Sequence, residues 1–309
     1  MTGGGRETTA DAVAVEHYLT VRVARETGDA AGEAAGPVTV ATLACTPEHL
    51  EELTVGFLVG QGLLPAGLDR RAGVSARREA GLDALGYRFE LSSDRRVATL
   101  TLNGPVASAG GAPGGDVPAG GAGSGVSRFV ASGCGQAVVF NQTRLLMELP
   151  RLTWAGHVPV ASLLSLTAAL QDAPIFRLTG GTHSALAGEV AGDGWPAGAV
   201  VVRREDIGRH NAVDKVVGHL WLAGKLPAQA PGEGGASGDR PLVLATSGRI
   251  SSDIVLKAAR AGFPVVVSHG APTVMAVEIG RELGLTVAGF ARGRRLNLYS
   301  HPERVTVIP

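Results

Sequence analysis

The amino-acid sequence predicts an α/β protein in which a C-terminal part, built on a mixed or parallel sheet with helical crossovers, follows a smaller α+β part. Between residues 242 and 290, short apolar runs alternate with helical patterns, as expected of parallel strands joined by helices. Before residue 103, β-branched runs surround a single helical pattern. The chain has 309 residues, 45% of them hydrophobic, and can therefore bury the core of one large or two small domains.

The N-terminal part is expected to follow a flexible tail over residues 1–14 and to occupy residues 15–103. Strands are predicted at 15–23 and 38–45, and a hairpin at 87–91 and 97–102, because these runs are apolar and of strand length. The helix between them is predicted to have Thr46 as its N-cap, Pro47 in its first position and Gly62 at its end.

Residues 104–126 are predicted to form a glycine-rich, flexible insertion. Nine of the 22 residues from 104 to 125 are glycine, so little apolar area is present to offset the entropy of ordering. The C-terminal part, residues 127–309, contains a second glycine-rich stretch at 227–239. Its strands are expected at 242–246, 264–268 and 285–290, and its helices at 251–261, at 273–283 and around Val213 and Leu220.

The composition excludes several classes of protein. Lys and Arg number 28, as do Asp and Glu, so no general positive field exists to attract nucleic acid. No apolar run approaches the roughly 20 residues that cross a bilayer, and no signal peptide is recognisable. A cytoplasmic protein without a membrane segment is expected. The two cysteines, Cys45 and Cys134, are too few for a disulfide framework or a four-thiolate metal site.

Cys134 is the candidate reactive thiol. Glycines flank it, the flexible insertion precedes it, and Arg128 is the nearest cation in the sequence. A nearby cation lowers the pKa of a thiol and so increases its reactive thiolate form. The alternative is that Cys134 is a small buried side chain, as most lone cysteines are. Cys45 ends an apolar strand and is expected to be buried.

A dense polar cluster occupies residues 179–183 and 205–215. The first segment contains a two-glycine turn, which places its last residues at a strand end, where ligand sites of such folds collect. The second contains a candidate helix cap and then polar residues in the first turn of a helix. Each residue alone could be a capping or solvated side chain, but the cluster indicates a binding site. The candidate binding residues are Thr182, His183, Asp206 (the candidate cap), Arg209 and His210.

Two loops that connect a strand with the next helix, 246–251 and 268–273, form a further group. Their small residues leave backbone N–H groups free, and the helix dipole favours an anion such as phosphate. Ordinary capping by Ser251 and Thr273 is the alternative. The loop after the last predicted strand brings three arginines to the same edge, which favours a phosphate-bearing ligand. The candidate residues of these loops are Ser247, Gly248, Arg249, Arg292, Arg294 and Arg295.

Several catalytic motifs are absent from the sequence, among them the nucleophile elbow, the P-loop and the zinc motif H-E-x-x-H. The zinc-deaminase pattern is absent as well, because Ser184 and Ala185 follow His183, and Ala137 stands three residues after Cys134. No catalytic metal, and no zinc, is expected.

Together these segments resemble the formate dehydrogenase accessory sulfurtransferases, the FdhD family, over most of the chain. The most specific segment is 205–215, with the sequence Glu-Asp-Ile-Gly-Arg-His-Asn-Ala-Val-Asp-Lys. The other segments that carry the resemblance are 46–47, 51–53, 56–58, 132–135, 179–183, 247–251, 271–273 and 290–295, the last shortly before Tyr299.

The resemblance implies a cytidine-deaminase-like fold without the deaminase metal, in a cytoplasmic sulfurtransferase of molybdenum cofactor biosynthesis. Such a protein accepts sulfur as a cysteine persulfide from a cysteine desulfurase. It transfers this sulfur to bis(molybdopterin guanine dinucleotide), the cofactor form destined for formate dehydrogenase. By the same resemblance, Cys134 is the persulfide cysteine, and the cofactor-binding loop consists of Phe290, Ala291, Arg292, Gly293, Arg294 and Arg295.

The expected partners are therefore a cysteine desulfurase, formate dehydrogenase and a guanine nucleotide or molybdopterin ligand, and the sequence leaves a homodimer open. One departure matters, since the family commonly has C-x-x-C where this chain has Cys134 and then Ala137. Persulfide transfer needs only one attacking thiolate, so a sulfur carrier acting through Cys134 is expected. The alternative is a non-catalytic carrier or chaperone that binds the guanine-dinucleotide cofactor without sulfur transfer.

Overall fold

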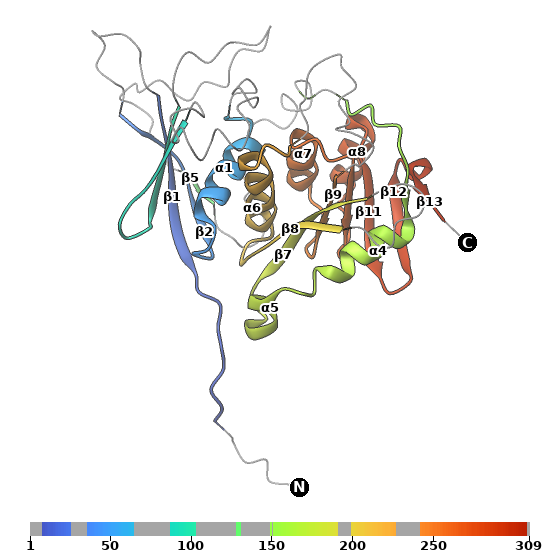
Figure 1. Ribbon diagram of the computed structural model, residues 1–309, viewed down its shortest axis with the longest axis horizontal. Coiled ribbons are helices and arrows are strands. Elements are labelled where there is room, and N and C mark those ends of the chain that lie inside the picture. The colour runs from blue at the N-terminus through green and yellow to red at the C-terminus, as the bar shows by residue number, and fades with distance from the viewer. Residues whose placement is uncertain are drawn as a thin grey trace.

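The computed structural model describes residues 8–25, 36–64, 87–102, 149, 151–190, 199–226 and 242–307, together with the backbone of residues 128–130. Two sheets with a pair of helices between them form the body of the protein (Figure 1). The expected insertions at 104–126 and 227–239, the first seven residues of the expected tail, and Cys134 lie outside the described residues.

The first sheet has the strand order β3-β4-β1-β2-β5. β1 pairs antiparallel with β2 and parallel with β4, and β3 and β4 form the predicted hairpin. β5 lies parallel to β2, with Val130 opposite Leu43, so residues 128–130 join the first sheet although they follow the expected boundary at 127. The strands are β1 (His17–Arg25), β2 (Val38–Cys45), β3 (Tyr87–Leu91), β4 (Val97–Leu102) and β5 (Arg128–Val130).

Helix α1 (Leu50–Gly60) begins later than the sequence predicts. Its N-cap is His49, in the left-handed conformation with φ 56°, so the expected N-cap at Thr46 is wrong. The reason is that the backbone N–H and the hydroxyl of Thr46 both donate to Asp206, which ends a strand of the second sheet. Thr46 therefore connects the two sheets instead of starting the helix.

The second sheet is mixed, with the strand order β12-β11-β10-β9-β7-β8. β9, β10 and β11 are parallel, as the alternating pattern predicts, while β12 and β7 run antiparallel to their neighbours. The loop expected at 290–295 is in fact the end of β11 and a turn into β12, with Gly293 at φ 59°. The strands are β7 (His183–Glu189), β8 (Ala199–Asp206), β9 (Leu242–Thr246), β10 (Val265–Ser268), β11 (Thr286–Arg292) and β12 (Arg295–Ser300).

Helices cover both faces of the second sheet. Leu244 of β9 belongs to the core on the side of α6, α7 and α8, whereas its neighbours Val243 and Ala245 pack with α4 on the other side. Burial on both faces is typical of parallel strands. The helices are α4 (Val160–Ala169), α5 (Pro174–Thr179), α6 (Arg209–Leu222), α7 (Ser252–Arg260) and α8 (Val274–Leu283). A short parallel pair, β6 (Val158–Pro159) and β13 (Val305–Thr306), and a 3₁₀ turn at Pro302–Arg304 complete the described structure.

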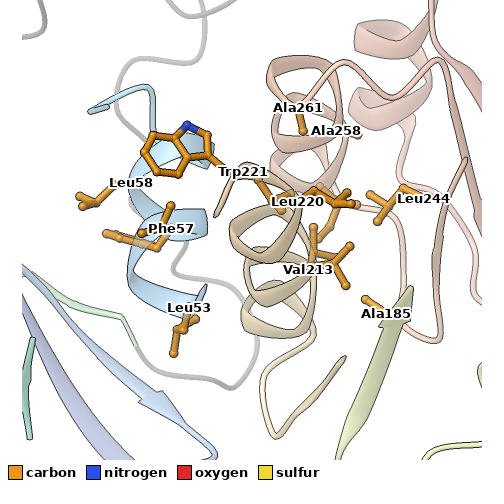
Figure 2. Packing of buried hydrophobic residues seen from close by; sticks show 14 of the residues in the cluster. Leu53, Phe57, Leu58, Ala185, Val213, Leu220, Trp221, Leu244, Ala258 and Ala261 are labelled. Atoms are coloured by element: carbon orange, nitrogen blue, oxygen red, sulfur yellow. The ribbon is translucent and has the colours of Figure 1, made fainter. Parts of the chain in front are cut away.

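Helices α1 and α6 lie side by side between the sheets (Figure 2). Their backbones approach closely at two glycines: a Cβ on Gly56 would lie 1.8 Å from the carbonyl oxygen of Asp214, and one on Gly218 would lie 1.9 Å from that of Glu52. Only glycine fits at such distances. The two helices therefore pack more closely than side chains would allow.

One hydrophobic core extends from the first sheet through this helix pair into the second sheet. It includes Leu43 of β2, Leu53 of α1, Val213 of α6 and Leu244 of β9. The N-terminal and C-terminal parts that the sequence predicts thus share a core, and the strand ends that face the helix pair are held in fixed positions.

Candidate functional site

The candidate site lies where the parallel strands β9, β10 and β11 end. The three following loops are joined by backbone hydrogen bonds, from Ile250 N to Ala271 O at 3.1 Å, from Thr273 N to Ile250 O at 3.0 Å and from Phe290 N to Gly270 O at 3.1 Å. The loops that the sequence assigns to one edge are therefore brought together. We call the loops 247–250 and 269–273 and the β11–β12 turn region 289–295, with His183, Arg209 and His210 beside them, the ligand edge.

Two glycines make this close contact possible. A Cβ on Gly248 would lie 2.9 Å from Cδ of Arg209, and a Cβ on Gly270 would lie 2.9 Å from the carbonyl oxygen of Gly248. The hydroxyl of Ser268 donates to that same carbonyl oxygen at 2.5 Å. The loop after β9 is therefore packed between the first turn of α6 and the loop after β10.

His183 stands at the start of β7, which runs antiparallel to β9, so it faces the end of β9. The Ser247 hydroxyl accepts a hydrogen bond from Ser184 N at 3.0 Å and lies 3.4 Å from Nδ1 of His183. The Ser247 hydroxyl therefore contacts both the backbone and the ring of the first two residues of β7 and holds the His183 ring beside the end of β9. Burial, and then the positive charge of Arg209, lower the pKa of His183.

Arg209 and His210 occupy the first turn of α6, as the sequence predicts. Nε2 of His210 lies 3.1 Å from the hydroxyl of Ser251 and 3.9 Å from a carboxylate oxygen of Asp253. Within the described residues the Ser251 side chain makes no cap to α7, although Ser251 occupies the N-cap position, whereas Thr273 caps α8 through Ala276 N. Burial, and next the charge of Lys257, lower the pKa of His210 to about 4.

The remaining candidates of the ligand edge differ in exposure. Arg249, Arg292, Gly293, Arg294 and Arg295 are exposed. Phe290 is 41% exposed and has the left-handed φ of 51°, which is uncommon for a residue with a large side chain. The Ala291 side chain is fully buried in the core shared with α4, so its part in the loop is confined to the backbone.

Two predicted site residues lie in the interior beside the ligand edge. Asp206 is fully buried, and its Oδ1 accepts from Gly208 N at 2.9 Å while Oδ2 accepts from Thr46 N at 3.0 Å. Gly208, rather than the expected Asp206, is the N-cap of α6. Thr182 is 5% exposed and its hydroxyl donates to Glu205 at 2.9 Å. Both side chains act within the protein.

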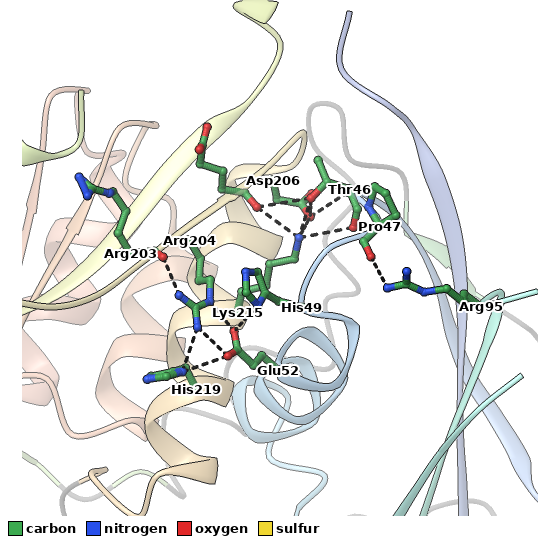
Figure 3. Close-up of polar contacts among 11 residues, drawn as sticks. Thr46, Pro47, His49, Glu52, Arg95, Arg203, Arg204, Asp206, Lys215 and His219 are labelled. Carbon is green, nitrogen blue, oxygen red and sulfur yellow. Dashed lines mark hydrogen bonds and ion pairs between the residues drawn. The ribbon is translucent and has the colours of Figure 1, made fainter. Parts of the chain in front are cut away.

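Sequence reasoning missed the residue that pairs with Asp206. Nζ of Lys215 lies 2.7 Å from Oδ2 of Asp206, and both side chains are completely buried (Figure 3). The same ammonium donates to the Thr46 hydroxyl at 2.7 Å and to Glu205 O at 3.2 Å. The available signal was the position of Lys215 among the apolar residues of α6, because a lysine at a buried position needs a paired acid.

A second polar link joins α1 to β8. The Arg204 guanidinium binds the Glu52 carboxylate through Nε at 2.5 Å and Nη2 at 2.7 Å (Figure 3). Burial favours the neutral form of Glu52, but the hydrogen bonds from Arg204 and His219 hold the pKa of this carboxyl below its usual value. Glu52 belongs to the segment 51–53 that carries the family resemblance, but the sequence alone does not predict its pairing with Arg204 and His219.

Cys45 is buried, as predicted. Its exposed fraction is zero, and burial, followed by the negative charge of Asp206, raises the pKa of its thiol to about 12. A thiol in this state is not a nucleophile at neutral pH. Cys45 therefore does not act as a second reactive thiol in place of the one that is missing at Ala137.

The described ranges contain no helix that is both long and apolar enough to span a membrane. Nor do they bring three or more His, Cys, Asp or Glu side chains together in a group that could hold a metal ion.

The fold and the site define a mixed α/β protein with an arginine- and histidine-bearing edge at the ends of parallel strands. The structure is similar, with a TM-score of 0.60, to the crystal structure of a protein from Desulfotalea psychrophila assigned as a formate dehydrogenase accessory protein. The similarity covers 98% of this chain and 94% of that one, at 22% sequence identity, and shows a shared fold.

This chain belongs to the FdhD/NarQ family, whose sequence model matches residues 117–306. A protein of Anaeromyxobacter dehalogenans strain 2CP-C, named sulfur carrier protein FdhD, is 34% identical over 96% of this chain and 88% of its own. One of Geobacillus kaustophilus with the same name is 31% identical over 96% of this chain and 91% of its own. The resemblance inferred from the sequence is thereby confirmed.

Proposed function

We propose that this protein is a sulfur carrier that accepts sulfur as a persulfide on Cys134 from a cysteine desulfurase and transfers it to the molybdenum cofactor of formate dehydrogenase. Two relatives that align with nearly the whole chain are named sulfur carrier proteins, which supports the coarse function. In the loading step, the Cys134 thiolate attacks the outer sulfur of the donor persulfide and the donor cysteine leaves as its thiolate, with no net oxidation. The cytidine-deaminase-like fold and the cytoplasmic location belong to the same proposal.

One observation carries the ligand half of this proposal, namely the joining of three strand-end loops into a single edge. Four exposed arginines belong to this edge: Arg249 lies on the loop after β9, and Arg292, Arg294 and Arg295 lie at the turn from β11 into β12. Arg209 lies beside them, in contact with Gly248. Guanidinium groups form paired, charge-assisted hydrogen bonds with phosphates. We therefore propose that the ligand edge binds a guanine-dinucleotide part of bis(molybdopterin guanine dinucleotide) through its phosphates, with the cofactor as cargo.

The thiol half is tested by mass spectrometry after incubation with a cysteine desulfurase and cysteine. We expect wild type and Cys45→Ser to gain the mass of one sulfur atom, and Cys134→Ser to gain none. In a complementation assay, Cys134→Ser should fail to activate formate dehydrogenase. Loading that persists in Cys134→Ser, or that is lost in Cys45→Ser, would reverse the assignment.

The missing second thiol favours one alternative, a non-catalytic carrier or chaperone of the guanine-dinucleotide cofactor. Ala137 occupies the position of the second family cysteine, and Cys45 cannot replace it because it is buried with a raised pKa. This alternative predicts that Cys134→Ser still supports formate dehydrogenase in the complementation assay. The same assay therefore separates the two functions.

The ligand half is tested by thermal shift with GDP and ADP at two salt concentrations. A ligand present at one hundred times its Kd stabilises the folded state by about 2.7 kcal/mol, a shift of several degrees. We expect GDP to stabilise wild type more than ADP does, and Arg295→Ala to reduce the GDP shift. Equal shifts with both nucleotides, or shifts that high salt removes altogether, would instead indicate non-specific charge attraction.

A further inference from the structure

We infer that Thr46, which directly follows β2 of the first sheet, is a positioning residue for the ligand edge of the second sheet and acts through Asp206 and the first turn of α6. The ligand part of this inference rests on the proposed function, whereas the structural link itself does not. Thr46 is 2% exposed, so it does not reach a ligand directly.

The first step of the link is the pair of bonds that Thr46 makes to one carboxylate oxygen. Its backbone N–H donates to Oδ2 of Asp206 at 3.0 Å, and its hydroxyl lies 3.2 Å from the same oxygen. The carboxylate of Asp206, at the end of β8 in the second sheet, is thus held by Thr46, the residue that follows β2 of the first sheet (Figure 3).

The second step is the other oxygen of the same carboxylate. Oδ1 of Asp206 accepts from Gly208 N at 2.9 Å and from Nδ2 of Asn211 at 3.0 Å. These two groups belong to the start of α6, on either side of Arg209 and His210. Asp206 also stands opposite His183 in the pairing of β7 with β8. This one carboxylate therefore holds the first turn of α6, and with it the positions of Arg209 and His210.

The third step is the buried charge of Lys215, which makes the arrangement sensitive to Thr46. The Lys215 ammonium is fully buried and has Asp206, the Thr46 hydroxyl, Glu205 O and Thr46 O around it. Thr46 thus supplies two of its acceptors. A buried charge that loses an acceptor must move or stay desolvated, and both outcomes disturb its paired carboxylate.

A parallel contact supports the same link. Nδ2 of Asn211 donates not only to Asp206 but also to the carbonyl oxygen of Ala44 at 2.8 Å. The end of β2 is consequently attached to the first turn of α6 at Ala44 and, through the carboxylate, at Thr46. Two attachments from residues on either side of Cys45 restrain both the distance and the orientation of that turn.

The test compares Thr46→Val with a matched control, Thr54→Val. Valine keeps the shape of threonine and removes the hydroxyl. Thr54 is also fully buried, but its hydroxyl donates within its own helix, to Leu50 O at 2.8 Å. Both changes delete one buried hydroxyl and its hydrogen bonds, and only the first touches the carboxylate of Asp206. Thr46→Ser is the conservative variant that retains the hydroxyl.

The first measurement is hydrogen exchange in the protein without ligand. We expect Thr46→Val to speed exchange of the Gly208 N–H and of the first turn of α6, and Thr54→Val to leave both as in wild type. Wild-type exchange in Thr46→Val, or equal acceleration by the two variants, would overturn the inference. If Thr46→Val does not fold, Asn211→Ser opens the link from its other end, and exchange at Gly208 is again expected to be faster.

The second measurement is the Kd for GDP by calorimetry. We expect Thr46→Val to weaken GDP binding by at least about fivefold, and Thr46→Ser and Thr54→Val to bind as wild type does. Weakening by Thr54→Val to the same extent would show a general loss of stability. If wild type binds no GDP, the nucleotide part of the proposed function fails, while the exchange measurement still decides the role of Thr46.

Discussion

His183 and His210 bring little positive charge to the ligand edge at neutral pH, because burial lowers the pKa of each imidazole and the cations near them lower it further. Arg209 and the exposed arginines therefore carry the positive charge. In a neutral imidazole one ring nitrogen donates a hydrogen bond and the other accepts one, so these two side chains offer hydrogen bonds rather than charge to a ligand. At His183 the contact of Nδ1 with the Ser247 hydroxyl holds the ring beside the end of β9.

The lowered pKa of His210 predicts a loss of stability in acid. The pKa of a histidine in the unfolded chain is near 6.5, and that of His210 in the folded protein is about 4. Between these values the unfolded state binds more protons, so the free energy of unfolding falls as pH decreases through this window. The contribution of this residue is at most about 3 kcal/mol. We expect denaturant melts between pH 7 and pH 4.5 to show this decline.

The variant His210→Asn isolates this contribution from the carboxylates that titrate in the same range. Asparagine cannot gain the proton, so the decline between pH 7 and pH 4.5 should be shallower in the variant than in wild type. The difference between the two proteins is the quantity to measure. Curves that run parallel over this range would refute the assignment of the acid sensitivity to His210.

At the scale of single residues, the sequence predicted the type of side chain at the ligand edge better than its exposure. The burial of Cys45 was predictable because it ends an apolar strand. Asp206 and Thr182 were predicted as ligand residues, yet the structure uses both side chains inside the protein. The residue type alone does not show whether a polar side chain binds a ligand or another part of the protein. The partner of Asp206 is Thr46, 160 residues away, and the partner of Thr182 is Glu205, 23 residues away.

At the scale of elements, the pattern of apolar residues located the predicted strands of the second sheet to within a few residues, since β9, β10 and β11 are buried on both faces. The start of α1 was not predictable, because Thr46 has the local signature of an N-cap and is diverted by a contact 160 residues away. The strand β12 was missed because it directly follows a two-residue turn in an arginine-rich segment that was assigned to a loop, and most of its side chains are partly or fully exposed.

The close packing of α1 on α6 predicts a large cost for a single methyl group. In Gly56→Ala, the added Cβ would lie 1.8 Å from the carbonyl oxygen of Asp214, and in Gly218→Ala 1.9 Å from that of Glu52. Both contacts are with backbone atoms, so the helices must separate. We expect each variant to lose about 3 kcal/mol or more in denaturant unfolding, at the upper end of the usual cost of overpacking.

Gly36→Ala is the matched control for this measurement. Gly36 precedes β2, and a Cβ there would meet no atom within 4 Å. Its free energy of unfolding should change by less than about 0.5 kcal/mol. A small effect of Gly56→Ala, similar to that of Gly36→Ala, would contradict the close approach of the two helices.

At the scale of the whole molecule, the two parts predicted from the sequence are joined more tightly than the composition indicates. The core is continuous across α1 and α6, and buried polar links run from Thr46 to Asp206 and from Glu52 to Arg204. Separation of the sheets would expose this core and leave Lys215 without its acceptors. The glycine-rich segment 104–126, which the sequence predicts to be an insertion, does not separate two independent cores.

This shared core predicts a single cooperative unfolding transition. Trp221 of α6 is 8% exposed and packs edge-on against Tyr87 of β3, with ring centroids 5.3 Å apart, so its fluorescence reports on the contact between the first sheet and the helix pair. In a variant with Trp154→Phe and Trp195→Phe, Trp221 is the remaining tryptophan of the three in the chain. We expect the urea midpoint from its fluorescence to coincide with that from far-UV circular dichroism, as two-state unfolding requires. A fluorescence midpoint at lower urea would mean that the first sheet separates before the second unfolds, and the joined core would then not act as one unit.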